Sequence, residues 1–200
     1  STVHTGGSVH LTSGEGTATS SGMIMIRSAN AGVGGTSGAL YFSSGTSKTG
    51  NSGQVHLGTG VATEGRGGAV VVTVGSGTSA RGGMVMVHGG RSTVHTGGMV
   101  HVSSGEGTVS SSGSIEIRSV NAGTGGMSGW LSFSSGTSKT GNSGAVYIGT
   151  GAATVGRGGD VVIAIGSGTS GAGGTAQMHG GRSTVHTGGS VHLTSGEGTA

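Results

Sequence analysis

The chain has 200 residues, a formal net charge of +3 from nine basic and six acidic residues, 51 glycines, and neither cysteine nor proline. This sparse charge argues against a basic nucleic-acid-binding stripe, the missing proline excludes collagen, and the missing cysteines exclude disulfide stapling. No apolar run approaches the roughly 20 residues that span a bilayer, so no membrane span is expected.

A glycine recurs along the whole chain at intervals of 15 residues, twice lengthened to 16. We call these residues the marker glycines and the stretch from one marker to the next a repeat. A short fixed period with one apolar stretch per unit is typical of solenoids, whose stacked neighbours bury a shared core. The predicted corner glycines are Gly7, Gly22, Gly38, Gly53, Gly68, Gly83, Gly98, Gly113, Gly129, Gly144, Gly159, Gly174 and Gly189.

A longer period lies above the first. The heptapeptide STVHTGG at residues 1–7 returns at 92–98 and at 183–189, which defines a super-repeat of 91 residues, or six repeats. We therefore expect one array over residues 1–200, with super-repeats 1–91 and 92–182 and a partial one at 183–200. Neither end resembles a capping repeat, which indicates a window of a longer array.

The residues two and four positions after each marker glycine are apolar in every repeat. We call them the apolar pairs. Their alternation and β-branched composition predict a strand with one buried face. The pairs are Val9/Leu11, Ile24/Ile26, Leu40/Phe42, Val55/Leu57, Val70/Val72, Val85/Val87, Val100/Val102, Ile115/Ile117, Leu131/Phe133, Val146/Ile148, Val161/Ile163, Ala176/Met178 and Val191/Leu193.

The second half of each repeat has a very small residue nine positions after the marker and often a valine two positions later, as at Ala31 and Val33. This pattern predicts a second, glycine-rich strand packed close to the first. The expected fold is all-β: a two-sided flattened β-solenoid of about 13 coils, with 15–16 residues per coil. Its two corners would lie at the marker glycine and at the glycine seven residues on, where positive φ or close approach needs glycine.

The outer face of the first predicted strand is also apolar in many repeats, at one and three positions after the marker. Scattered surface hydrophobes are normal, but recurrence in two columns favours a contact surface, and methionine adapts to irregular partners. The predicted assembly interface consists of Met23, Met25, Tyr41, Val71, Met84, Met86, Met99, Trp130 and Tyr147.

Charged side chains fall one repeat apart, as with Arg91 and Glu106 or Arg182 and Glu197. We expect exposed ion pairs of about 0–1 kcal/mol that help to fix register.

Histidines also fall on neighbouring repeats, but no carboxylate or cysteine completes a metal-ligand set. Asp160 is the only aspartate, and no nucleophile, base and orienting acid occur in one pattern. The sequence therefore predicts no enzyme, no metal site and no cofactor.

A threonine column ten positions after the marker, as at Thr17, Thr63 and Thr78, resembles the ice-binding face of antifreeze β-solenoids. Those faces carry paired threonine ladders, whereas this column is single and is interrupted by Lys48 and Lys139. Ice binding remains an alternative beside a purely structural threonine ladder.

The pattern Ser/Gly-Gly-x-Val-x-Val with a Gly/Ser/Thr-rich return resembles short-repeat β-solenoids of secreted adhesins and of microbial and algal cell-surface fibres. The resemblance implies an extracellular or cell-surface location. Together with the long repetition and the doubly apolar strand, it leads to the hypothesis of a structural filament or appendage subunit that self-associates through its outer apolar sheet face. The expected partner is another copy rather than nucleic acid, and the stalk of a surface adhesin is a further alternative.

Overall fold

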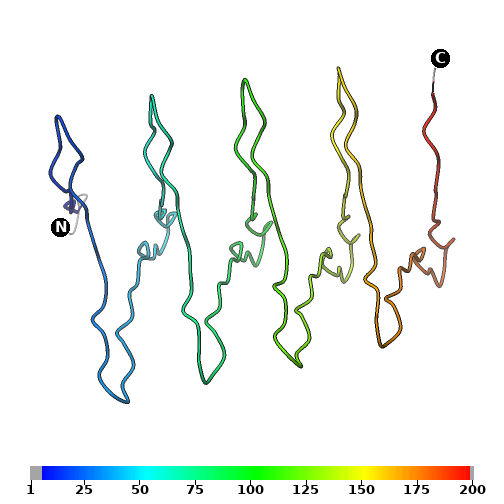
Figure 1. The fold of residues 1–200 in the computed structure, drawn as a ribbon, viewed down its shortest axis with the longest axis horizontal. Coiled ribbons are helices and arrows are strands. Elements are labelled where there is room, and N and C mark those ends of the chain that lie inside the picture. Colours follow the sequence, from blue (N-terminus) through cyan, green and yellow to red (C-terminus); the bar gives the residue numbers. More distant parts are fainter. Residues whose placement is uncertain (1–5, 199–200) are drawn as a thin grey trace. The chain divides into compact units, whose positions relative to one another are not determined.

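The structure is a computed structural model that describes residues 6–198 of the chain. It divides into two units, Ser1–Val100 and His101–Ala200, which are treated separately below. Residues 6–198 contain neither α-helix nor β-strand, and Figure 1 draws a ribbon that reverses direction repeatedly, without strand arrows. The predicted all-β, two-sided solenoid is therefore wrong.

No residue in the described part of the chain is buried, so the predicted buried face of the strands is absent as well. Only Gly16, Ser28, Gly107 and Ser119 are half-buried; all other described residues are exposed. The chain exposes 20347 Å². A folded globular protein of its 18.7 kDa mass would expose about 8,300 Å², and a fully unfolded chain about 27,000 Å². The surface is thus closer to that of an unfolded chain.

The chain reverses direction once in each of the twelve repeats that begin at Gly7 through Gly174, ten to twelve residues after the marker glycine. This position lies inside the predicted second strand rather than at a predicted corner. Val109 and Val155, which were expected on the inner face of that strand, are instead 99% and 97% exposed. The reversals occupy 17–19, 33–34, 48–50, 63–65, 78–80, 93–95, 108–110, 124–125, 139–141, 154–156, 169–171 and 184–186.

A single backbone hydrogen bond closes the neck of many of these loops. The N–H of the marker glycine donates to the carbonyl oxygen of the glycine eight residues earlier, with N···O distances of 2.7–3.0 Å. One bond of this kind is not a strand ladder, in which successive residues exchange hydrogen bonds. The bonded pairs are Gly22/Gly14, Gly83/Gly75, Gly98/Gly90, Gly113/Gly105, Gly174/Gly166 and Gly189/Gly181.

The marker glycines are needed for close approach and not for an unusual backbone angle. Among the described residues only Gly34, Gly125 and Gly156 have positive φ, and none of these is a marker. A Cβ atom added to Gly174, however, would lie 2.7 Å from Cγ2 of Ile165, the residue nine positions earlier. At the six bonded necks such a Cβ would lie 2.7–3.3 Å from the nearest atom of the facing segment, and at Gly98 that atom is the backbone N of Gly90, 2.8 Å away. The necks are therefore tight, and Gly98 is the marker where backbone leaves least room for a side chain.

Glycine nine residues after the marker permits one type of reversal. A Cβ atom on Gly16 would lie 2.6 Å from the carbonyl oxygens of both Thr19 and Ser20, so the chain can fold back only over a glycine. The carbonyl oxygens three and four residues on are crowded in the same way at Gly77, Gly107 and Gly168.

Where alanine stands nine residues after the marker, the chain often makes a second type of reversal, in which the glycine three residues later has positive φ. Gly34 follows Ala31 with φ +79°, Gly125 follows Ala122 with φ +80°, and Gly156 follows Ala153 with φ +130°. Positive φ is accessible to glycine at little cost and is costly for other residues. In these three bends the small residue and the later glycine therefore act as a set.

Serine at this position makes a third type, in which the side chain holds the bend. Ser92 Oγ accepts hydrogen bonds from the backbone N–H groups of Val94 and His95, at 3.4 and 2.9 Å. Ser183 does the same for Val185 and His186, at 3.4 and 2.8 Å. Such local side-chain acceptors stabilise turns in competition with regular secondary structure.

Replacing this serine tests its role directly. In Ser92→Ala we expect the His95 amide to exchange with solvent about two- to fivefold faster, because one modest hydrogen bond is lost. The His186 amide, which lies in the equivalent bend 91 residues later, is the control within the same molecule. Hydrogen exchange followed by NMR measures both, and equal rates at the two sites in the variant would contradict the assignment.

Extended segments fail to become strands because nothing pairs with them along their length. Alternation of side chains sets an extended backbone and two faces, but a sheet also needs a neighbour that offers hydrogen-bond groups in register. At each bonded neck the two segments share one backbone hydrogen bond, and no ladder of further backbone hydrogen bonds follows it in the described residues. The result is a chain of loops that repeats its local geometry every 91 residues, as the matching bonds Gly35 N to Gly32 O and Gly126 N to Gly123 O illustrate at 3.2 Å.

Candidate association surface

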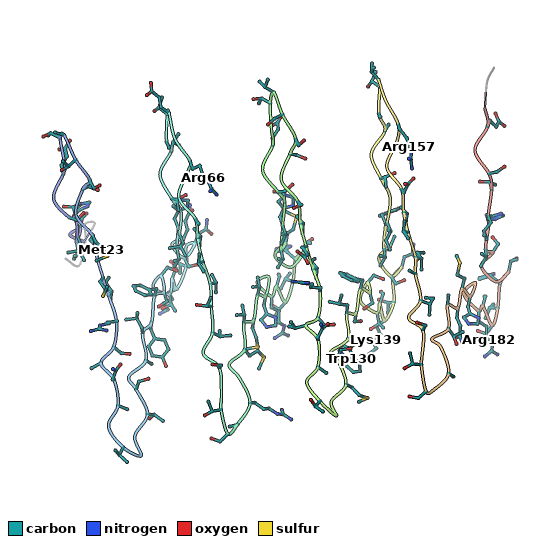
Figure 2. The ribbon with its side chains drawn as sticks, viewed as in Figure 1. Met23, Arg66, Trp130, Lys139, Arg157 and Arg182 are labelled. Carbon is teal, nitrogen blue, oxygen red and sulfur yellow. The ribbon has the colours of Figure 1, made fainter. Side chains whose placement is uncertain are left out.

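The side chains of the apolar pairs are all exposed, and no sheet forms in residues 6–198. From Ile24 onward, the valine, leucine and isoleucine side chains two residues after the marker are 44–61% exposed, from Val191 at the low end to Val55 at the high end. The nine residues predicted as the assembly interface are 65–93% exposed. Figure 2 shows two of these, Met23 and Trp130, as side chains on the ribbon. The apolar side chains four residues after the marker, from 52% exposed at Ile26 to 80% at Ile163, overlap the range found two residues after it. The predicted buried face is therefore not formed, and only the position two residues after the marker is less exposed.

Three successive repeats of the unit His101–Ala200 bring apolar side chains around one hollow. Its walls come mostly from the apolar pairs that follow Gly113, Gly129 and Gly144. The hollow has a volume of about 700 Å³ and is open to solvent. Its lining consists of Ile115, Ile117, Phe133, Val146, Tyr147, Ile148 and Gly149.

The same set of residue types stands 91 positions earlier, in the unit Ser1–Val100. There the sequence has Ile24, Ile26, Phe42, Val55, His56, Leu57 and Gly58, so only Tyr147 is replaced by a markedly more polar residue. The residues 91 positions away from each apolar pair are also apolar. This constancy indicates that the chain requires apolar side chains at these positions.

The residues of the predicted assembly interface do not recur in this way. At 91 residues from Met23, Met25 and Tyr41 stand Ser114, Glu116 and Ser132, and only Val71 keeps its type, at Val162. Trp130 and Tyr147 correspond to Ala39 and His56. The sheet on whose outer face these side chains were expected is absent from residues 6–198, and the super-repeat does not present them at a constant interval.

The ion pairs of the described residues join charges that are two or three residues apart in sequence. Glu116 Oε1 lies 2.9 Å from Nε of Arg118, and both side chains are more than two-thirds exposed. Asp160 pairs with Arg157 three residues earlier. The predicted pairing of Arg91 with Glu106 is not among the ion pairs of the described residues. At this exposure each pair contributes little to stability.

The side-chain hydrogen bonds of histidines in the described part of the chain are local. Residues 6–198 contain no cluster of three or more histidine or acidic side chains able to hold a metal ion. Ser190 Oγ lies 2.9 Å from Nε2 of His192, and His179 Nε2 lies 3.2 Å from Gln177 Oε1. A serine and a histidine without an orienting acid do not make a nucleophilic triad.

The threonines of the predicted ice-binding column begin bends instead of lining a flat sheet. Thr17, Thr63, Thr78 and Thr93 each open a reversal, and Thr199 lies outside the described residues. Nothing in this arrangement favours ice binding.

Comparison with known proteins found no match to a family, to a curated protein sequence or to a solved structure. The likeness to adhesin and fibre repeats thus stays a prediction from sequence. Within the described part of the chain, no helix has the length and apolar character to cross a membrane.

Proposed function

We propose that this chain is a non-enzymatic structural protein of the extracellular space, whose copies associate into a filament or surface layer. The observation that supports the proposal is an apolar pair in every repeat, with no buried side chain among the described residues. Exposed apolar surface of this extent is characteristic of interaction sites. The side chains that are apolar in every repeat are therefore exposed in the single chain, and a partner would remove them from solvent.

Area considerations support association strongly. The chain exposes about 12,000 Å² more than a globular protein of its mass would, whereas a stable interface needs only about 800 Å² from each partner. Ordering a backbone costs roughly 1–2 kcal/mol per residue, and this cost must be offset by buried surface and hydrogen bonds. A single chain provides neither in sufficient amount, so neighbouring copies are the most direct source of both.

The extracellular location is proposed from composition and from the likeness of the repeat to cell-surface fibres. The chain is rich in glycine, serine and threonine, has nine basic and six acidic residues, and shows no group of metal-binding histidine or acidic side chains in residues 6–198. These features suit a passive, repetitive material rather than a soluble enzyme.

Sedimentation velocity over a dilution series tests the proposal, with electron microscopy of the concentrated sample. We expect dispersed chains of high frictional ratio at low concentration and large, elongated or layered particles at high concentration. A chain that sediments as a monomer at every concentration, with no particles in the microscope, would overturn the proposal.

The single tryptophan reports which side chains are covered. Trp130 is 92% exposed and does not recur in the other super-repeat. We expect acrylamide to quench its fluorescence almost equally before and after association, because the apolar pairs and not Trp130 are covered. A blue shift of the emission with strong protection from quenching would instead favour the interface of Met23, Trp130 and their column.

A further inference from the structure

One segment of the unit Ser1–Val100 carries sulfur and imidazole groups at alternate positions. Met84, Met86 and His88 stand one, three and five residues after their marker glycine, and residues 81–92 contain no bend. Alternate side chains of an extended segment point to the same side. The three side chains therefore share one face, and those of Met84 and Met86 are 75% and 68% exposed, which leaves their sulfur atoms accessible.

Contacts at the equivalent positions of the next super-repeat show that such side chains meet. His179 Nε2 lies 3.2 Å from Gln177 Oε1, and these residues stand five and three positions after their marker. Ser190 Oγ lies 2.9 Å from His192 Nε2, at one and three positions after the following marker. Side chains one, three and five residues after a marker are thus close enough to bind one ion together.

The neck of the following loop brings a further sulfur atom to the same place. Gly98 N–H donates to the carbonyl oxygen of Gly90 at 2.7 Å, and a Cβ atom on Gly89 would lie 3.7 Å from the carbonyl carbon of Met99. His88 directly precedes Gly89, so the backbone of Met99 lies beside it. The Met99 side chain is 83% exposed and has three rotatable bonds, which let its sulfur atom reach a shared ion.

We infer that Met84, Met86, His88 and Met99 bind a soft monovalent metal ion, of which copper(I) is the biological example. We call these four residues the Met/His cluster. Thioether sulfur selects copper(I) and imidazole suits copper, whereas carboxylate and carbonyl oxygens suit magnesium, calcium and manganese. The sequence-based expectation of no metal site considered carboxylate and cysteine as the completing ligands, and methionine is a further soft ligand. This inference does not depend on the proposed structural function.

Charge around the Met/His cluster also favours a monovalent ion. Residues 65–105 contain no acidic residue, and Arg81 and Arg91 flank the cluster in sequence. Neutral thioether and imidazole ligands leave the charge of a bound ion uncompensated, and repulsion from nearby cations grows with that charge. A divalent ion is therefore disfavoured more strongly than a monovalent one.

Two partial versions of the cluster elsewhere in the chain provide internal controls. Met23 and Met25 also stand one and three residues after a marker, but Arg27 replaces the imidazole. In the other partial version, 91 residues after the cluster, His179 is kept and the methionines are replaced. The residues at the four equivalent positions are Thr175, Gln177, His179 and Ser190.

Silver(I), a redox-stable probe of the same coordination chemistry, tests the inference in the dilute, monomeric chain. NMR of the ε-methyl groups follows all seven methionines separately. We expect one equivalent of silver(I) to shift the signals of Met84, Met86 and Met99 before those of the other four, and copper(I) without oxygen to act in the same order. Equal shifts of all seven signals would show binding to isolated thioethers and would overturn the inference.

Substitution of the methionines measures their share of the affinity. We expect Met84→Leu/Met86→Leu to weaken silver(I) binding at least about tenfold, because two soft ligands are lost while side-chain size is kept. The matched control Met23→Leu/Met25→Leu should bind silver(I) at the cluster like the original chain. Equal weakening in both variants would contradict a site at the cluster.

Substitution of histidine tests the imidazole in the same way. We expect His88→Leu to weaken silver(I) binding by about threefold or more, and His179→Leu to leave it unchanged, because His179 has no methionine at the neighbouring positions. Zinc(II) is expected to leave the methionine signals in place. Equal effects of the two histidine variants, or saturation of the cluster by zinc(II) at the same concentration as silver(I), would overturn the assignment to a soft monovalent ion.

Discussion

Removing the apolar side chain four residues after each marker in one super-repeat is expected to raise the concentration needed for association at least tenfold. The variant carries serine at Leu11, Ile26, Phe42, Leu57, Val72 and Val87. Each of these side chains gains about 1.5–3 kcal/mol when it passes from water to a fully buried site, so losing six removes most of the driving force that one super-repeat provides. Sedimentation velocity at the concentration where the original chain associates measures the effect.

The matched control removes six apolar side chains from the same super-repeat on the opposite alternation. It carries serine at Met23, Met25, Tyr41, Val71, Met84 and Met86. We expect its association to change by only a few-fold, because five of these six positions are polar in the following super-repeat. If the control dissociates while the first variant associates normally, the interface predicted from sequence is correct and the apolar pairs are not the contact.

The second large effect is expected at a glycine with no room for a methyl group. In Gly16→Ala the added Cβ would lie 2.6 Å from two carbonyl oxygens, so the bend at 17–19 must open. The neck bond from Gly22 N to Gly14 O, 2.9 Å long, then loses its geometry. We expect the Gly22 amide to exchange at least tenfold faster, a change that corresponds to about 1.4 kcal/mol.

Two controls accompany this substitution. Gly14→Ala places its Cβ in open space, at a position without positive φ, and should leave exchange of the Gly22 amide nearly unchanged. The Gly113 amide, bonded to Gly105 in the equivalent loop, reports on the same molecule away from the change. Equal acceleration in Gly14→Ala and Gly16→Ala would show that the bend does not depend on the missing side chain.

Because residues 6–198 have no buried core, we expect the proposed function to depend on a surface between chains rather than on a site within one chain. Residues 6–198 contain no group of three or more histidine or acidic side chains that could hold a metal ion. What the repeat maintains is the apolar character of two positions in every 15 or 16 residues. A structural role uses that feature directly.

Local features of this protein follow from sequence alone. The 15-residue period, the alternation at Ile115 and Ile117, and the need for glycine where two segments approach are all set by side-chain size and by the two faces of an extended backbone. Of this alternation the structure keeps only a lower exposure at the position two residues after the marker, from Ile24 onward. The type of bend also follows the residue nine positions after the marker in most repeats, as Gly16, Ala31 and Ser92 illustrate.

Only the tertiary structure decided where the chain reverses and whether its segments pair. The sequence predicted corners at glycines such as Gly7 and a second strand through Val109, whereas the chain bends at 108–110 and leaves Val109 in solvent. Likewise, no local pattern shows that Ile117 and Ile148 line one hollow, because that depends on the path of the loops between them. Alternation determines the faces of a segment, but pairing depends on a partner segment in register, and a single chain of this protein does not supply one within residues 6–198.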